Sequence, residues 1–332
     1  IVWGSMSGTV DQTRFINFNP AETKAALLLD NGNVTADVAT VRNCLFIAPT
    51  AIATASAWGI RTKQRILVEN STFRGPGLAS GSPATALYFE FNTEADVSEV
   101  RNNVFVESDT VIAVAPTVDI YIQYNCFDDV QDIVSQGESG LGNDCFTLEL
   151  FLNNFRNNHC ETDPLFVARP MGTWTSSGLY DADAGRSVFF DENATWQTDE
   201  LVGLILNPDI SYTPPLRAPI AANTATTITV LGDVATYGAL GDTYEIIDYH
   251  LSSASPCIDT GDPAFAMAPG IADVDGRFRV WDGDADGSAT VDRGATEYEV
   301  PFYGDLNCDG VVDLFDIDPF VWAVSDPDYY EQ

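Results

Sequence analysis

Residues near the C-terminus have the types and the spacing of a calcium-binding loop. In the segment GDLNCDGVVDLFDIDPF, oxygen-bearing side chains stand at loop positions 1, 3, 5, 9 and 12, and a glycine at position 6 permits a sharp turn. The predicted ligands are Asp305, Asn307, Asp309, the backbone carbonyl of Val311, Asp313 and Asp316. Hard oxygen ligands in this order wrap one divalent cation, so we expect Ca²⁺ as the cofactor. The alternative is an acidic turn exposed to solvent.

A second acidic phrase, DGDADGSATVD, repeats part of this pattern. Its candidate ligands are Asp282, Asp284, Asp286 and, further on, Asp292. The phrase has Arg293 at the twelfth position, where the first loop has an acid. Crowded carboxylates repel one another, and a bound divalent ion relieves that repulsion. We therefore weigh a second Ca²⁺ site against a solvated loop.

The charge balance excludes one class of partner. The chain has 15 basic and 49 acidic residues, a formal net charge of −34, and 45% hydrophobic residues. That hydrophobic content is sufficient for a large core. The negative field repels nucleic acid but permits cations and neutral glycans. We expect a folded, acidic protein that does not bind nucleic acid.

The six cysteines favour disulfides over a zinc site, because no CxxC spacing occurs and only two histidines are present. The sequence leaves the pairing open, with Cys145–Cys160 as the first expectation because it closes a short loop. Cys308, within the acidic loop, is expected to pair with a cysteine in a segment that follows the given sequence.

No apolar run is long enough to span a membrane. The start IVWGSMSG has no initiator Met or leader, which suggests a processed product or a fragment. We expect a secreted or cell-surface protein.

A recurring phrase in the first half predicts the fold. The pattern Asn-x-x-Phe ends at Phe46, Phe73 and Phe105, and looser copies are Tyr124–Phe127 and Asn153–Phe155. Intervals that vary between about 22 and 32 residues are typical of parallel β-helix coils, which combine short strands with loops of variable length. We predict that Phe46, Phe73, Phe105 and Phe127 stack inside and that the Asn side chains form a ladder at a bend. A β-sandwich with coincidental phrases is the alternative.

Period-2 patterns and β-branched residues predict strands at 65–69, 97–106, 118–123, 226–230 and 244–247. The character of the sequence changes after DPLFV, where Trp174, Trp196 and a long apolar stretch follow. We predict four parts: coils at 1–168, an inserted all-β module at 169–250, a terminal coil and cap at 251–300, and a partial calcium-binding segment at 301–332.

Several phrases resemble known families. LSSASPCIDTGDP, DVDGRFRV and VDRGATEYE resemble the terminal coil of secreted bacterial right-handed β-helix proteins, the pectate-lyase-like superfamily. The segments IAANTATTITVLGD and GDTYEI are similar to parts of small β modules of bacterial surface proteins and phage tail proteins. The last loop resembles one dockerin repeat, whereas a full dockerin has two. Together these features resemble planctomycete-type proteins and imply a right-handed parallel β-helix with a possible cohesin-like partner.

The resemblance leaves the activity open, because this fold carries lyases, hydrolases and adhesins. A lyase would need a basic residue, for which the weak candidates are Arg61, Lys63 and Arg65. A polygalacturonase-type hydrolase would need carboxylates on one face, but Asp128 and Asp129 are adjacent and point to opposite faces. We assign no catalytic residue. We predict a structural, adhesive or assembly role, with self-association or a matrix or surface partner. A calcium-dependent polysaccharide lyase or a non-catalytic glycan-binding protein is the alternative.

Overall fold

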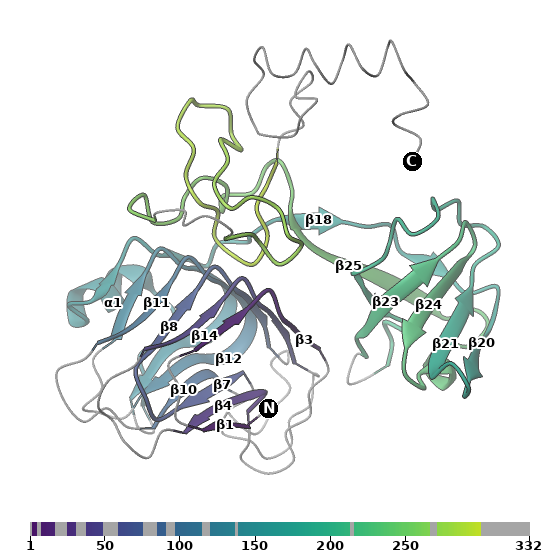
Figure 1. Ribbon diagram of the computed structural model, residues 1–332, viewed down its shortest axis with the longest axis horizontal. Coiled ribbons are helices and arrows are strands. Elements are labelled where there is room, and N and C mark those ends of the chain that lie inside the picture. Colours follow the sequence, from purple (N-terminus) through teal and green to yellow (C-terminus); the bar gives the residue numbers. More distant parts are fainter. Residues whose placement is uncertain are drawn as a thin grey trace.

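The computed structural model is nearly all β, with 4% of it helical (Figure 1). It describes residues 2–4, 8–16, 25–30, 38–48, 59–75, 85–90, 97–114, 120–136, 139–212, 216–265 and 271–299. Within these ranges one α-helix, α1 (Cys145–Phe151), and one 3-10 helix, η1 (Ala235–Tyr237), interrupt the strands. The all-β prediction is confirmed. The calcium loop predicted at Asp305–Asp316 lies outside the described residues.

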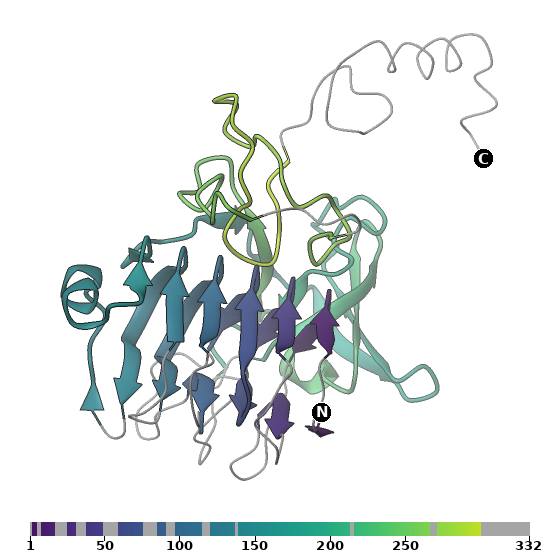
Figure 2. The ribbon, with the colours of Figure 1, turned by 60° about the vertical axis from the view of Figure 1, so that its left-hand side comes forward.

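Three faces of parallel strands form the part of the molecule that we call the coil stack (Figure 2). The first face contains β1 (Val2–Gly4), β4 (Leu27–Asp30), β7 (Ile60–Thr62), β10 (Thr85–Phe89) and the second halves of β12 (Val104–Val114) and β14 (Cys126–Gln136). The second face contains β2 (Thr9–Asp11), β5 (Ala39–Arg42), β8 (Ile66–Glu69), β11 (Ser98–Arg101), β13 (Ile120–Gln123) and β16 (Phe155–Arg156). The third face contains β3 (Arg14–Ile16), β6 (Leu45–Ile47), β9 (Thr72–Arg74), the first halves of β12 and β14, and β17 (His159–Cys160).

Each strand of the coil stack pairs in parallel with the strand one coil further along the chain. The short strand β15 (Ser139–Gly140) pairs antiparallel with β14. The chain therefore passes through the same three faces in turn, an arrangement compatible with the predicted β-helix. Three predicted segments contain strands, but the one at 97–106 is divided, because Asn102 separates β11 from β12.

The Asn-x-x-Phe phrase marks a bend. Every coil turns from the second face to the third at a residue whose φ lies between 48° and 56°: Gln12, Asn43, Asn70, Asn102, Tyr124 and Asn157. Asn tolerates this left-handed conformation better than most residues. The last repeat was placed wrongly by sequence, since its bend is Asn157 rather than Asn153.

The predicted Phe stack is confirmed. Neighbouring ring centroids lie 4.5, 4.6, 4.9, 5.4 and 6.3 Å apart, in the order Phe15, Phe46, Phe73, Phe105, Phe127 and Phe155. All six rings are stacked, and the four predicted ones have 0% exposed surface. Phe155 joins from the second face, since the partner of Phe127 in strand register is Cys160. The rings form the core of the coil stack.

The amide ladder lies one position after the bend, not at the bend as predicted. Asn103 Nδ2 donates to Asn125 Oδ1 at 3.0 Å, and Asn125 Nδ2 donates to Asn158 Oδ1 at 3.1 Å. The bend asparagines serve another purpose. Asn43 and Asn102 accept hydrogen bonds from a later segment of the chain.

Antiparallel strands form a second part, the β-module, beside the coil stack (Figure 1). Its strands are β18 (Phe166–Ala168), β19 (Gly172–Thr173), β20 (Ser176–Asp181), β21 (Arg186–Phe190), β22 (Ile205–Asn207), β23 (Ala218–Asn223), β24 (Thr227–Leu231) and β25 (Thr243–Leu251). The module has its own core, in which Trp174 stacks on Phe189 at 5.0 Å and on Tyr244 at 3.9 Å. The predicted strands at 226–230 and 244–247 are confirmed as β24 and part of β25.

The covering segment, residues 251–265 and 271–299, lies along the bends of the coil stack (Figure 2). Its described residues make two isolated bridges and no further strand after β25. Gly294 N donates to Asn102 O at 2.8 Å, and Arg293 Nη1 donates to Asn125 O at 2.9 Å. This segment therefore contacts several coils from the side. The boundaries of the four predicted parts stay predictions.

Candidate functional site

The acidic loop of the covering segment is built by its own carboxylates. Asp282 Oδ1 accepts from Asp286 N at 3.0 Å, and Asp282 Oδ2 accepts from Gly287 N at 2.9 Å. Asp284 Oδ1 also accepts from Asp286 N, at 3.0 Å. Gly287 has a φ of 92°, a conformation that favours glycine. These bonds hold Asp282 and Asp284 on the same side of a tight turn.

Asp259, from an earlier part of the covering segment, completes the cluster. Its Oδ2 accepts from Asp284 N at 2.9 Å, and its Oδ1 accepts from Thr290 N at 3.0 Å. One oxygen each of Asp259, Asp282 and Asp284 lies within 4.8 Å of the others. Burial, together with the charge of Asp284, raises the pKa of Asp259. Three carboxylates meet here in a partly desolvated place.

The cluster fits a calcium ion in its dimensions. Oxygen ligands lie about 2.3–2.6 Å from Ca²⁺, so two ligands of one ion are separated by at most about 5 Å. The observed separation of up to 4.8 Å satisfies this limit. Backbone carbonyls and water would supply the further ligands that Ca²⁺ requires. We call Asp259, Asp282 and Asp284 the acidic centre.

The four weaker sequence candidates have different positions. Asp282 and Asp284 belong to the acidic centre, whereas Asp286 is exposed at the end of the loop and accepts from Ser288 N at 2.8 Å. Asp292 is 1% exposed and accepts from Asp259 N at 2.7 Å and from Tyr298 N at 2.6 Å. Burial raises the pKa of Asp292 to about 7. Asp292 therefore supports the loop that carries Asp259.

Sequence reasoning missed Asp259, because its distance along the chain from Asp282 carries no loop spacing. The residue lies in the phrase SPCIDTGDP, which was assigned only to the fold. Its φ of 52° gives it a left-handed backbone, and such residues are enriched in Asp and Asn. In the sequence, Asp259 is therefore only a single acidic residue in a turn. Such residues are common in turns that bind no ligand.

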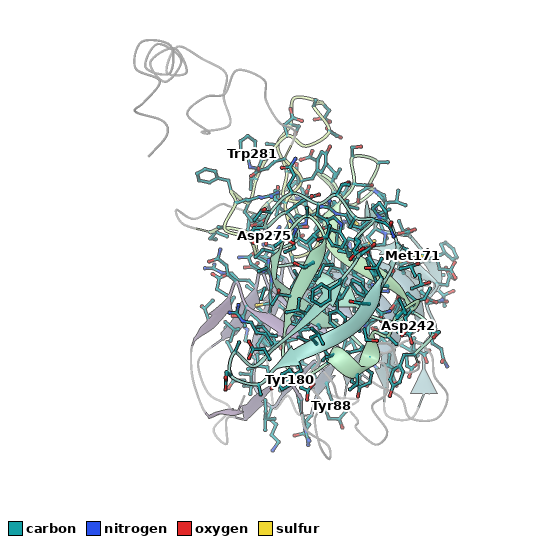
Figure 3. The ribbon with its side chains drawn as sticks, turned by 90° about the vertical axis from the view of Figure 1, so that its right-hand side faces the viewer. Tyr88, Met171, Tyr180, Asp242, Asp275 and Trp281 are labelled. Atoms are coloured by element: carbon teal, nitrogen blue, oxygen red, sulfur yellow. A yellow bond between two sulfur atoms is a disulfide. The ribbon has the colours of Figure 1, made fainter. Side chains whose placement is uncertain are left out.

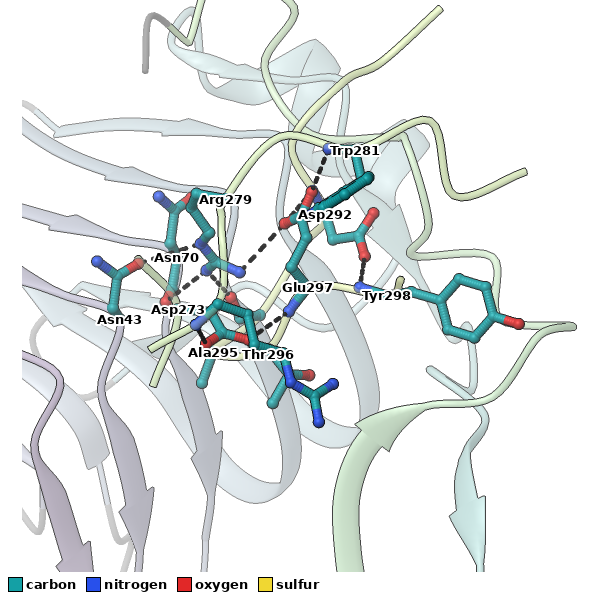
Figure 4. Close-up of polar contacts among 12 residues, drawn as sticks. Asn43, Asn70, Asp273, Arg279, Trp281, Asp292, Ala295, Thr296, Glu297 and Tyr298 are labelled. Carbon is teal, nitrogen blue, oxygen red and sulfur yellow. Dashed lines mark hydrogen bonds and ion pairs between the residues drawn. The ribbon is translucent and has the colours of Figure 1, made fainter. Parts of the chain in front are cut away.

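A fully buried ion pair fastens the covering segment to the coil stack (Figure 4). Arg279 donates to Glu297 Oε2 at 3.3 Å, to Asn43 Oδ1 at 3.1 Å and to Asn70 O at 3.0 Å, and it also bonds Gly294 O. The side chains of Arg279 and Glu297 have 0% exposed surface. Burial, together with the charge of Asp292, raises the pKa of Glu297. Arg279 thus joins two coils to the covering segment.

A histidine cluster joins the covering segment to the β-module. His250 Nδ1 lies 2.5 Å from Asp248 Oδ1, and His250 Nε2 lies 2.8 Å from Asp275 Oδ2. These hydrogen bonds raise the pKa of His250 to about 9. Arg169 pairs with Asp248 at 2.9 Å, and Arg14 pairs with Asp275. The imidazole is charged at neutral pH, so it serves as a clamp and not as a general base.

The weak lyase candidates contact neighbouring groups. Arg61 and Lys63 both pair with Glu90, Lys63 at 3.5 Å, and Arg65 Nε donates to Val97 O at 2.9 Å. Arg61 also lies over the ring of Tyr88, 5.8 Å from its centroid. The structure therefore brings Arg61 and Lys63 together around one carboxylate, whereas Arg65 bonds a backbone carbonyl.

The β-module has a cavity of about 590 Å³. Its floor includes Tyr244, whose hydroxyl donates to Asp191 Oδ2 at 2.7 Å, and its wall includes the half-buried Trp196. Met171, which also lines this cavity, is 62% exposed (Figure 3). An aromatic wall with polar groups close by is suitable for a small polar molecule.

The expected disulfide is present at bonding distance, with the Cα atoms of Cys145 and Cys160 5.6 Å apart. No helix in the described part of the chain is long and apolar enough to cross a membrane. No protein family, curated protein or solved structure matches this chain.

Proposed function

We propose that this chain is a secreted or cell-surface, calcium-stabilised right-handed parallel β-helix protein with a structural role in an extracellular assembly. The observation that carries the proposal is the acidic centre. Asp259, Asp282 and Asp284 converge on a segment that lies along several coils, so an ion there would stabilise the architecture. The loop at Asp305–Asp316 would bind a second Ca²⁺ and offer a surface to a cohesin-like partner.

The ion pairs of the coil stack support a non-catalytic role over the lyase. A lyase base must be free to take a proton from the substrate. Arg61 and Lys63 instead share Glu90, and Arg65 is bonded to a backbone carbonyl. Other charged side chains on the outer faces are also paired across coils, including Arg42 with Asp11 and Arg101 with Glu69. Such pairs between coils fit a scaffold.

One end of the coil stack supports association with a second copy. Helix α1 lies at this end (Figure 1), where Phe146 is 71% exposed and Leu150 is 70% exposed. The two residues are four apart and thus share one helix face. The disulfide at Cys145 holds this helix to β17. On a chain of charge −34, an apolar face is where two like-charged copies meet with least repulsion.

Sedimentation velocity of the full chain with Ca²⁺ or with chelator tests this role. We expect an oligomer with Ca²⁺ that dissociates in chelator, and a monomer for Phe146→Ser/Leu150→Ser under both conditions. Met171→Ser, which removes an exposed apolar side chain from the β-module, is the matched control and should still associate. A monomeric wild-type chain that releases unsaturated uronic products from pectin or alginate would establish the lyase instead.

A glycan-binding role is the second candidate, and the cavity beside Trp196 favours it. Neutral oligosaccharides present apolar faces that stack on aromatic rings and hydroxyls that bond carboxylates. Affinity electrophoresis in neutral polysaccharide gels would detect such binding as retardation. Trp196→Ala should abolish the retardation if this role is correct, whereas Tyr180→Ala, which removes an exposed aromatic ring that does not line the cavity, should preserve it.

A further inference from the structure

Two of the remaining cysteines meet where the covering segment contacts the coil stack. Cys126 is the first residue of β14, and Cys257 lies in the covering segment. Both have 0% exposed surface and belong to one apolar cluster with Val104, Val106 and Ile258. They come from distant parts of the sequence, so the fold alone brings them together.

The surrounding backbone fixes both residues. Arg293 N donates to Cys257 O at 3.1 Å, and Arg293 Nη1 donates to the carbonyl of Asn125, the residue before Cys126, at 2.9 Å. Cys257 N donates to Ser255 Oγ at 3.1 Å. One arginine therefore bonds the backbone at both cysteines, which limits how far the sulfur atoms separate.

The two thiols are in direct contact. A hydrogen bond between the side chains, followed by burial, raises the pKa of Cys126. The raised pKa keeps the Cys126 thiol protonated and slows its exchange once the protein is folded. A bond between them would therefore form during folding, before the covering segment closes over the site.

We propose that Cys126 and Cys257 form a second disulfide, which covalently fastens the covering segment to the coil stack. The two thiols lose two protons and two electrons as the S–S bond forms. A small-molecule disulfide such as oxidised glutathione is the oxidant, and its own S–S bond is reduced to two thiols. The inference rests on the proposed extracellular location for this oxidant. The link would close a loop of roughly 130 residues, a length at which a disulfide strongly restricts the unfolded chain.

Cys44 is an internal control. It is buried in the coil stack, away from this cluster, and its thiol lies 3.0 Å from the carbonyl oxygen of Arg42. Burial raises the pKa of Cys44 to about 12. Burial alone thus does not distinguish the three cysteines, whereas contact with another thiol does.

The test is to refold the full chain in glutathione buffers of increasing oxidised fraction. Each sample is quenched with acid, denatured, alkylated and digested without reduction, and the peptides are identified by mass. We expect a linked peptide pair containing Cys126 and Cys257, lighter by two hydrogens than the separate peptides, together with alkylated Cys44. The Cys145–Cys160 pair reports whether the buffer is oxidising enough.

Two results would overturn the inference. One is full alkylation of Cys126 and Cys257 in a buffer that has completely joined Cys145 to Cys160. The other is a link from either residue to Cys44 or Cys308. If Cys145–Cys160 also fails to form at every ratio, the proposed extracellular location fails as well. The reductant-dependent drop in melting temperature should be smaller in a Cys126→Ala/Cys257→Ala variant, which keeps only the short Cys145–Cys160 loop, than in a Cys145→Ala/Cys160→Ala variant, which keeps the longer one.

Discussion

Truncation of Phe105 to Ala tests the coil stack at its centre. The ring has no exposed surface and lies between Phe73, at 4.9 Å, and Phe127, at 5.4 Å. A buried Phe removes about 150–250 Å² from water, which is worth about 4–6 kcal/mol at 25 cal/mol per Å². The methyl group of Ala retains part of this burial free energy, whereas the loss of the contacts with two neighbouring rings adds to the destabilisation. We expect a loss of about 3–5 kcal/mol in the free energy of unfolding.

Chemical denaturation in chelator, where the proposed association is absent, measures this loss by circular dichroism. Phe146→Ala is the matched control, because the same side chain is removed from a position that is 71% exposed. We expect that control to change stability by at most about 0.5 kcal/mol. If Phe105→Ala costs no more than Phe146→Ala, the stacked rings do not form the core and the coil assignment is wrong.

Three further changes test the covering segment. With free Ca²⁺ at 100 times its dissociation constant, one bound ion adds about 2.7 kcal/mol to the free energy of unfolding. Asp284→Asn should reduce this Ca²⁺-dependent gain, which denaturant titration measures. The control variant Asp286→Asn should retain it. Arg279→Met should cost about 3–5 kcal/mol because it leaves Glu297 buried without its cation, and adding Glu297→Gln should recover part of that cost. The pKa of His250 is raised to about 9 in the folded chain, so protonated His250 contributes at most about 3 kcal/mol to the free energy of unfolding. This contribution is fully present below about pH 6.5 and is lost as the pH rises through 9. His250→Gln should flatten that dependence, and an unchanged slope would refute it.

Local patterns predicted the coil stack because each coil repeats one residue type at one structural position. A buried Phe in most coils and an Asn at most of the left-handed bends produce a repeated pattern in the sequence. The first and last coils were missed or misplaced because the pattern weakens there. Gln12 replaces Asn at the first bend, and Cys160 replaces Phe in the last strand register.

Contacts between distant segments produce no such repeated pattern in the sequence. Arg279 is fully buried and bonds Asn43, yet in the sequence it is one arginine within an acidic stretch. Asp259 joins Asp284 only because the covering segment folds back on itself. Two of the three residues of the acidic centre, Asp282 and Asp284, were sequence candidates because residues within one loop share a spacing, whereas Asp259 lies outside that loop.

The acidic centre and the buried ion pair act on the same piece of chain. Asp292 accepts from the backbone of Asp259 on one side, and its backbone N–H donates to Glu297 on the other. Without a cation, the charges of Asp259 and Asp292 repel, and burial favours the protonated form of Asp292 and Glu297. A divalent ion at the acidic centre would lower the cost of ionising Asp292. Because Asp292 lies between the two, calcium at the surface and the Arg279 contact in the interior would together hold the covering segment on the coils.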